Sequence, residues 1–360
     1  MAVVTVHASQ PYEVSIDEAP IESAASQAAN MGADAVFLVS DDNVAPLYAP
    51  RILDACARVG LPCASFVFPA GESSKTFATY AACLDAMARA HATRSTIVVA
   101  LGGGVVGDLA GFAAATYMRG CRFIQIPTSL LACVDSSVGG KTGIDLDAGK
   151  NLVGAFHQPS SVLIDTSLLE TLPDRFFIDG TAEVLKYGII ADPALFAELE
   201  TRLMPNDARI PSIVCRCIEI KRDVVQADEY ERGVRRILNF GHTVGHAIER
   251  LSSYSVTHGF AVATGMALIA RASACAGFCS ESDARRVEKV VERYGFKMRP
   301  RFSASALAEA AASDKKRSGA SIDTVCLRAV GAVEIVPMTL DRFARFIEAA
   351  CADGAGPCRI

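Results

Sequence analysis

The sequence has no excess of positive charge, no long apolar run and only six histidines. Its 35 basic and 40 acidic residues give a net charge of −5, whereas a nucleic-acid-binding protein needs a basic patch or stripe. No apolar run approaches the roughly 18 to 20 residues that span a bilayer. These absences argue against nucleic acid and membrane as partners.

The first residues also lack the basic-then-apolar pattern of a secretory signal peptide. Twelve cysteines are present, but neither Cys215 with Cys217 nor Cys275 with Cys279 has a second pair at zinc-ribbon spacing. Free thiols in a reducing compartment are the better interpretation. We therefore expect a cytoplasmic protein.

The 360 residues are enough for two domains. Strand-like runs alternate with helical patterns in the first half, which predicts a parallel sheet covered by helices on both faces. The strand candidates are residues 3–7, 14–16, 35–40, 64–68, 97–101, 123–127 and 161–165. We predict an α/β domain over residues 1–173.

After Pro173 the apolar residues recur at intervals of three and four, which predicts a mainly helical domain over residues 174–360. The expected helices cover 181–190, 193–203, 210–226, 234–251, 259–276, 280–294, 304–313 and 340–350. A small hairpin is expected between the last two of them, from 322–327 and 332–336.

A glycine-rich turn follows the strand candidate at 97–101. The run Gly102-Gly103-Gly104-Val105-Val106-Gly107 fits the pattern G-x-G-x-x-G between a strand and a helix. Glycine permits a tight turn and a close backbone approach, and the helix N-terminus offers unpaired N–H groups to a pyrophosphate. The alternative is a tight βα turn without a ligand.

An ordinary dinucleotide-binding unit has an acidic residue about 20 residues after the glycines. This chain has Pro127-Thr128-Ser129 at the end of the next strand instead. Asp41 and Glu72 follow earlier strands and are candidates for binding a ribose, and Lys75 is a candidate for the adenosine side.

A second polar group lies just downstream. Asp135, Lys141, Lys150 and Asn151 fall within seventeen glycine-rich residues, and Arg119 upstream adds positive charge. Lysine in a tight polar loop suits a phosphate or a carboxylate, and the glycines before Lys141 permit a close backbone approach. The alternative is a solvated surface loop.

Three of the six histidines lie within seventeen residues. His242 and His246 share a helix face at spacing i, i+4, and His258 begins the next predicted helix. Neutral imidazole is a common zinc ligand, and Glu183 is a candidate carboxylate ligand. One histidine would then be free for substrate or proton chemistry, while the alternative is a set of capping or core histidines. Thr243 follows His242, so the H-E-x-x-H motif of metalloproteases is absent.

Six motifs together resemble the 3-dehydroquinate synthase family of sugar-phosphate cyclases. They are Gly102–Asp108, Asp135–Lys141, Gly149–Asn151, Ala182–Gly188, Leu238–His246 and Asp314–Lys316. The resemblance implies an N-terminal Rossmann-like domain that binds NAD, an all-α C-terminal domain that binds a divalent metal (Zn or Co), and a homodimer. It implies conversion of the sugar phosphate 3-deoxy-D-arabino-heptulosonate 7-phosphate to 3-dehydroquinate and phosphate in the shikimate pathway.

The resemblance also implies roles for individual residues. Metal ligands are Glu183, His242 and His258. Substrate contacts and catalytic roles fall on Arg119, Asp135, Lys141, Asn151, Lys186, Lys221, Arg235, Asn239, His246 and Lys315. Cofactor contacts fall on Asp41, Asn43, Glu72, Lys75, Gly103, Gly104, Val105, Asp108, Thr128, Ser129, Lys141, Lys150, Thr171 and Leu172.

Two positions depart from the family pattern. Ser129 stands where the family often has threonine, and the hydroxyl is kept. Phe260 stands where the family commonly has glutamate, and a phenyl ring cannot hydrogen-bond to support His258 as a carboxylate can. We therefore expect weaker local support for this metal ligand.

The implied reaction runs by oxidation with NAD, β-elimination of phosphate, return of the hydride, and intramolecular aldol closure. Three alternatives remain: another cyclase such as an aminodehydroquinate or valiolone-type synthase, a metal-dependent polyol dehydrogenase, and a non-catalytic NAD-binding module. Asn239, His246 and the run Asp314-Lys315-Lys316 favour the shikimate enzyme over the first of these.

Overall fold

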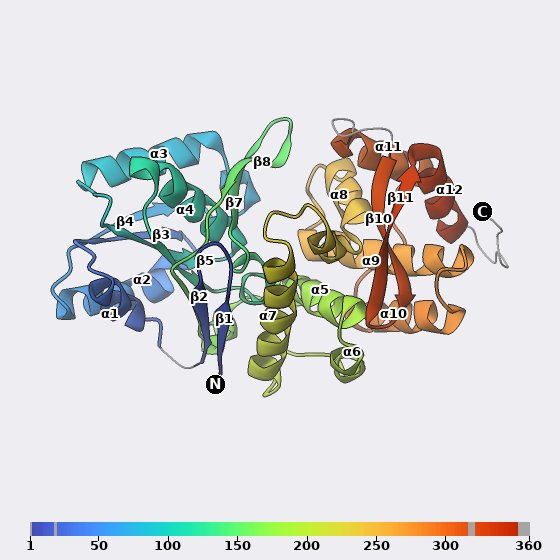
Figure 1. Cartoon of the computed structure of the whole chain (residues 1–360), viewed down its shortest axis with the longest axis horizontal. Coiled ribbons are helices and arrows are strands. Elements are labelled where there is room, and N and C mark those ends of the chain that lie inside the picture. The colour runs from blue at the N-terminus through green and yellow to red at the C-terminus, as the bar shows by residue number, and fades with distance from the viewer. Residues whose placement is uncertain (1, 18–19, 316–320, 352–360) are drawn as a thin grey trace. The chain divides into compact units, whose positions relative to one another are not determined.

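The computed structural model describes residues 2–17, 20–315 and 321–351, and the side chains of 313–315 lie outside that description. The chain divides into two compact units (Figure 1). The first contains Met1–Pro173 and Pro205–Tyr230, and the second contains Asp174–Met204 and Glu231–Ile360.

Seven of the described strands form one sheet in the first unit. They are β1 (Ala2–Val6), β2 (Tyr12–Ile16), β3 (Val36–Asp41), β4 (Cys63–Phe68), β5 (Ile97–Gly102), β6 (Phe123–Pro127) and β9 (Ser161–Ile164). Their order is β1-β2-β9-β6-β5-β3-β4, and every pairing except β1 with β2 is parallel. The predicted parallel sheet is confirmed.

Helices cover both faces of this sheet (Figure 1). The helices α1 (Ser23–Asn30) and α2 (Ala45–Arg58) pack on one face, and α3 (Phe77–Arg89) and α4 (Gly104–Thr116) pack on the other. Alternate residues of β3 join the two cores, with Val36 and Leu38 in the first and Phe37 and Val39 in the second. Burial on both faces explains why these strands are apolar without interruption.

The connections that follow β6 contain structure that the sequence did not predict. A five-residue π-helix, η3 (Ala132–Ser136), precedes an antiparallel hairpin of β7 (Lys141–Leu146) and β8 (Gly149–Phe156). The shorter turns of this unit are η1 (Glu72–Ser74), η2 (Tyr117–Arg119) and η4 (Thr166–Thr171). The segment that contains Lys141, Lys150 and Asn151, which the sequence predicts to be a polar loop, is therefore a pair of antiparallel strands.

The helix α7 (Ile210–Ala227) packs against β1, β2 and η3 and so belongs to the first unit. The sequence pattern predicts this segment as part of the second domain, because it follows Pro173. Its amphipathic pattern predicts a helix correctly, but the pattern does not say which surface will cover the apolar face of Ile213, Val214 and Cys217.

The second unit is mainly helical, as predicted. Its elements are α5 (Asp174–Ile190), α6 (Pro193–Leu199), η5 (Val234–Asn239), α8 (His242–Leu251), α9 (His258–Cys275), α10 (Glu281–Arg293), α11 (Ala304–Lys315), α12 (Leu340–Cys351) and the hairpin β10 (Ser321–Ala329) with β11 (Ala332–Thr339). Buried on nearly all sides, α9 contacts α5, α8, α10 and α12. The predicted hairpin is confirmed.

The predicted continuous helix over 234–251 is wrong. The chain breaks at Gly241, whose φ of 80° is left-handed, and α8 begins at the next residue. A Cβ at Gly241 would lie 2.8 Å from the backbone nitrogen of Met266 and 2.8 Å from the carbonyl oxygen of Val262. Glycine therefore permits both the turn and the close approach of α9, and it fixes where His242 starts its helix.

We expect Gly241→Ala to lower the free energy of unfolding by about 2 to 4 kcal/mol, because backbone strain and overpacking add. Gly277→Ala is the matched control: its φ is 74°, and no atom lies within 4 Å of the added Cβ. That variant should lose only about 1 kcal/mol. Urea unfolding measures both, and equal losses would show that contact with α9 does not constrain Gly241.

Candidate functional site

The turn from β5 into α4 is the segment that the sequence predicts to be a nucleotide cradle. Gly103 precedes α4 and has no side chain to cap it, so the first N–H groups of the helix remain for a ligand. Thr128 donates its N–H to the carbonyl of Gly102 at 3.0 Å, which brings the loop after β6 alongside. A Cβ on Gly104 would lie 3.1 Å from the Ser136 hydroxyl. The glycines therefore keep the backbone accessible.

The cradle lies beside the point where the strand order reverses. β5 pairs with β3, while the chain between them first runs to the outer strand β4. Open α/β sheets bind ligands outside the carboxyl ends of strands at such a switch point. Asp41 ends β3 there, and its Oδ1 accepts N–H groups from Asn43 at 3.0 Å and Val44 at 2.9 Å. Burial raises the pKa of the Asp41 carboxyl, and these two hydrogen bonds oppose the change.

Lys75 connects several predicted residues of this unit. Its Nζ donates to Asp108 Oδ2 at 2.5 Å and to Asn151 Oδ1 at 2.5 Å. The lysine is only 3% exposed; burial lowers its pKa, but Asp108 and Glu72 outweigh burial and raise it. Glu72 lies 3.6 Å from Lys150 Nζ. Four predicted cofactor residues and one predicted substrate residue therefore meet in one charged network.

The other predicted residues of this unit lie on several different elements. Lys221 on α7 lies 3.1 Å from the Asp135 carboxylate on η3 and also donates to the Asp135 carbonyl. Lys141 opens β7 and Arg119 ends η2, and both side chains are exposed. The Thr171 hydroxyl lies 2.7 Å from the phenol of Tyr48 on α2. Val105, Ser129 and Leu172 lie in α4, after β6 and after η4 respectively.

Asp145 belongs to the Lys75 network but was not predicted from the sequence. Its Oδ1 accepts the N–H of Asn151 at 2.7 Å across the β7–β8 hairpin. Burial raises the pKa of the Asp145 carboxyl to about 6. The sequence offered no signal for this contact, because it depends on an irregular hairpin that the polar residues did not predict.

The second unit brings Glu183, His242 and His258 together from α5, α8 and α9. Glu183 Oε1 lies 3.4 Å from the Nε2 atom of each histidine. A tetrahedral metal with bonds of about 2.1 Å separates its ligand atoms by about 3.4 Å. Both carboxylate oxygens are buried: Oε2 pairs with the Lys186 ammonium, and Oε1 faces the two imidazoles. The donor set and its spacing therefore fit zinc or a similar divalent ion.

Charge concentrates around Glu183. Burial opposes ionisation, but Lys186, which forms an ion pair with it, and His242 hold the pKa of the Glu183 carboxyl well below its usual value. Burial lowers the pKa of the His258 imidazole, but Glu183 and Glu249 outweigh burial and raise it to about 10. A cation is thus stabilised at this point, and a divalent ion can take the place of the proton.

Glu249 gives His258 the support that Phe260 cannot. His258 Nδ1 lies 3.3 Å from Glu249 Oε2, and the glutamate is 2% exposed. A metal-binding histidine usually bonds a carboxylate or carbonyl through its other nitrogen, and His242 Nδ1 likewise lies 3.2 Å from the Phe240 carbonyl. The expectation of weaker support for His258 is therefore wrong, because the Glu249 carboxylate on α8 contacts its imidazole.

His246 remains at the edge of the cluster. It is exposed, and its ring centroid lies 6.0 Å from that of His258. His246, Glu249 and His258 also have ligand atoms close enough for a metal, but Glu249 there faces Nδ1 of His258. The Glu183 set is the better metal site, because both of its imidazoles present Nε2 to a buried carboxylate.

Other predicted residues of the second unit lie on η5 and at the end of α11. Arg235 is 2% exposed, and Asn239 donates to Glu231 Oε1 at 2.9 Å. Lys315 is the last residue of α11, but its side chain, like all of Lys316, lies outside the described part of the chain.

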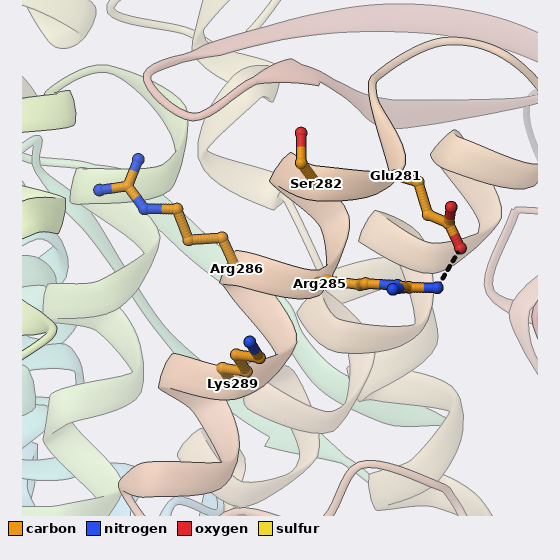
Figure 2. A pocket seen from close by; sticks show the side chains of 5 residues that line it. All are labelled: Glu281, Ser282, Arg285, Arg286 and Lys289. Atoms are coloured by element: carbon orange, nitrogen blue, oxygen red, sulfur yellow. Dashed lines mark hydrogen bonds and ion pairs between the residues drawn. The ribbon is translucent and has the colours of Figure 1, made fainter.

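A separate hollow lies on the surface of α10 (Figure 2). It is lined by Glu281, Ser282, Arg285, Arg286 and Lys289. Arg285 pairs with Glu281 at 2.6 Å and Arg286 pairs with Glu200. Two of its three cations are thus already matched, and the hollow shows no catalytic arrangement.

Comparison with known proteins decides the family. Residues 65–179 match the family model described as 3-dehydroquinate synthase N-terminal, and residues 180–317 match the one described as 3-dehydroquinate synthase C-terminal. The chain belongs to the 3-dehydroquinate synthase family. The 3-dehydroquinate synthase of Pelobacter propionicus is 45% identical over 350 residues, which cover 95% of this chain and 98% of the relative.

Solved structures agree with the fold. A 2-deoxy-scyllo-inosose synthase complexed with carbaglucose-6-phosphate, NAD+ and Co2+ has a TM-score of 0.84 and 25% identity, covering 96% of this chain and 99% of that one. A 2-epi-5-epi-valiolone synthase from Streptomyces hygroscopicus with NAD+ and Zn2+ bound has a TM-score of 0.86 and 28% identity, covering 94% and 95%. The predicted family and two-domain fold class are confirmed.

The activity follows from the family and from relatives that match over nearly the whole chain. The chain is a phosphorus–oxygen lyase that acts in the shikimate pathway. Among the described helices, none combines the length and apolar character needed to cross a membrane.

We expect Glu249→Gln to weaken metal binding by about 10- to 100-fold, because the His258 imidazole loses its anionic partner. Competition with a chromogenic chelator measures the affinity. Glu288→Gln is the matched control, since it removes a carboxylate that pairs with Arg271 on the same unit. Equal affinities for the two variants would contradict the role of Glu249.

We also expect Asp145→Asn to raise the free energy of unfolding, and by about 1 kcal/mol more at pH 8 than at pH 5. The folded pKa of about 6 lies above the ordinary value, so the folded state binds more protons between the two values. Stability is therefore lost as the pH rises toward 6, and the neutral amide avoids that loss. Urea unfolding at both pH values tests this, with exposed Asp147→Asn as control; a pH-independent difference would contradict it.

Proposed function

We propose that the chain carries out its 3-dehydroquinate synthase reaction with NAD at the glycine cradle and a divalent metal, Zn2+ or Co2+, at the Glu183 cluster. The observation that carries the metal assignment is the 3.4 Å spacing of a buried Glu183 carboxylate oxygen from the Nε2 atoms of two imidazoles. The NAD+ and Co2+ or Zn2+ of the two solved synthases support the same pair of groups.

Glu183, His242 and His258 would hold the metal, and Glu249 would orient His258. When bound, the metal would supply a Lewis acid that lowers the pKa of a substrate hydroxyl, and NAD would supply a hydride acceptor that is regenerated in each turnover and so is not consumed. Lys186 keeps Glu183 ionised and places a buried ammonium beside the ligands.

The polar residues of the first unit have two proposed roles. The cofactor would be bound by the backbone of the cradle, by the side chains of Asp41, Glu72, Lys75, Asp108 and Lys150, and by the segments that carry Asn43, Thr128, Ser129, Thr171 and Leu172. Asp135, Lys141, Asn151, Lys221 and Arg119 serve the substrate. The Asp135–Lys221 ion pair supports this division, because it presents an acid with an adjacent cation for proton transfer and for anionic oxygens.

In the second unit, Arg235, Asn239, His246 and Lys315 are proposed to bind oxygens of the substrate. Phosphate elimination develops negative charge, and fixed cations and hydrogen-bond donors stabilise such charge. His246 is exposed beside the metal cluster, which suits a residue that meets a ligand. The chain's contribution is therefore largely to position one flexible substrate through successive steps.

We also propose a homodimer in the cytoplasm. The dimer rests on the family resemblance, and sedimentation equilibrium tests it. The location is supported by the thiols, since every cysteine in the described part of the chain is free, as in a reducing compartment.

We expect Glu183→Ala and Lys186→Ala each to lower phosphate release from 3-deoxy-D-arabino-heptulosonate 7-phosphate by at least about 100-fold, because metal binding or charge stabilisation is lost. A coupled phosphate assay measures turnover, and exposed Lys289→Ala should retain it. Chelation should abolish release in the parent protein.

Three outcomes would contradict the proposed function. Full turnover after metal removal would exclude the metal assignment. Stoichiometric accumulation of NADH would indicate a dehydrogenase, and faster turnover of sedoheptulose 7-phosphate than of the heptulosonate phosphate would indicate a different cyclase.

A further inference from the structure

The β7–β8 hairpin is irregular where it meets the Lys75 network. Ile144 pairs with Val153 and Leu146 pairs with Gly149, so the single residue Asp145 lies opposite residues 150–152. The strand β8 therefore bulges there. Bulges commonly redirect side chains beside active sites, and this one presents Lys150 and Asn151.

The bulge holds Asn151 in an unfavourable backbone conformation. Its φ is 55°, in the left-handed region that costs free energy for a residue with a side chain. The Asp145 carboxylate accepts the N–H of Asn151 at 2.7 Å and so replaces the ladder bond that the bulge removes. This hydrogen bond offsets part of the free-energy cost of the left-handed backbone conformation of Asn151.

Asp145 is itself fixed to the body of the first unit. Its N–H donates to the carbonyl of Lys75 at 2.8 Å, and it forms a parallel bridge with Thr76. The Lys75 side chain in turn donates to Asn151 Oδ1 and to Asp108 on α4. Lys75, which lies just before α3, therefore holds the hairpin at two points. Its carbonyl accepts the N–H of Asp145, and its side chain donates to Asn151.

Two consecutive residues then reach different partners. Lys150 Nζ lies 3.6 Å from Glu72, while Asn151 Oδ1 accepts from Lys75. We propose that Asp145 is a positioning residue that holds this bulge, so that Lys150 serves the cofactor and Asn151 serves the substrate. The inference rests on the proposed roles of Lys150 and Asn151, and it assigns to Asp145 the geometry that separates them.

The positioning role needs a hydrogen-bond acceptor at this place, and it does not need a charge. Asp145→Asn keeps an acceptor oxygen at similar reach, whereas Asp145→Ala removes it and leaves the Asn151 N–H without that partner. Asp147→Ala is the matched control, because it removes an exposed aspartate from the turn of the same hairpin.

The experiment measures NAD affinity by calorimetry and kcat/KM for the heptulosonate phosphate in all three variants, with metal content as a check. Asp145→Ala should weaken NAD binding and lower kcat/KM, the latter by about 10- to 100-fold. Asp145→Asn should restore both to within about threefold of the parent, a rescue that loss of an unrelated packing contact would not show. Asp147→Ala should leave both unchanged.

The inference is overturned if Asp145→Ala retains parental NAD affinity and kcat/KM, or if Asp145→Asn is as impaired as a folded Asp145→Ala. If Asp145→Ala does not fold, the asparagine variant decides: parental kinetics support the role and a tenfold loss overturns it. NAD affinity separates this test from the proposed function, because a parent that binds NAD without releasing phosphate refutes the reaction while the comparison of variants still stands.

Discussion

The buried carboxylate of Glu183 is the group on which the second unit depends. An uncompensated buried charge costs several kcal/mol, and the chain compensates this one with Lys186 from the same helix and with imidazoles from α8 and α9. Since these groups come from three helices, the arrangement exists only when the helices are packed. A metal would replace part of this compensation and add coordination bonds, which links metal binding to the integrity of the unit.

The first unit also contains a buried ionised side chain, but of the opposite charge. Lys75 is buried, and acidic groups on η1, α4 and β7 surround it. The ammonium can satisfy several acceptors at once, so it holds the hairpin near the glycine cradle. Both units therefore place a buried ion at the point where chemistry is proposed, and each ion organises the polar side chains around it.

Architecture alone does not identify the reaction. Two synthases that share the fold, each with NAD+ and a divalent metal bound, are named for different products, 2-deoxy-scyllo-inosose and 2-epi-5-epi-valiolone. The identity of 45% to a 3-dehydroquinate synthase over nearly the whole chain is what distinguishes the family. Reaction type thus follows from side chains placed on a shared fold.

Local patterns in the sequence determined the element types, the glycine cradle and the ligand candidates. Three features depend only on residues that are close in sequence, and so they can be predicted without a structure. They are the apolar strand runs, the spacing of His242 and His246, and the G-x-G-x-x-G turn. The family resemblance then selected Glu183, His242 and His258, and the structure brought these three residues together.

Only the tertiary structure decided the contacts between residues distant in sequence. Glu249 replaces the support that Phe260 lacks because α8 packs against α9. Asp145 reaches Asn151 because β8 bulges, and α7 joins the first unit because its apolar face meets β1, β2 and η3. Each outcome depends on which surfaces meet, and a sequence pattern shows that a face is apolar or charged without naming the surface that will cover it.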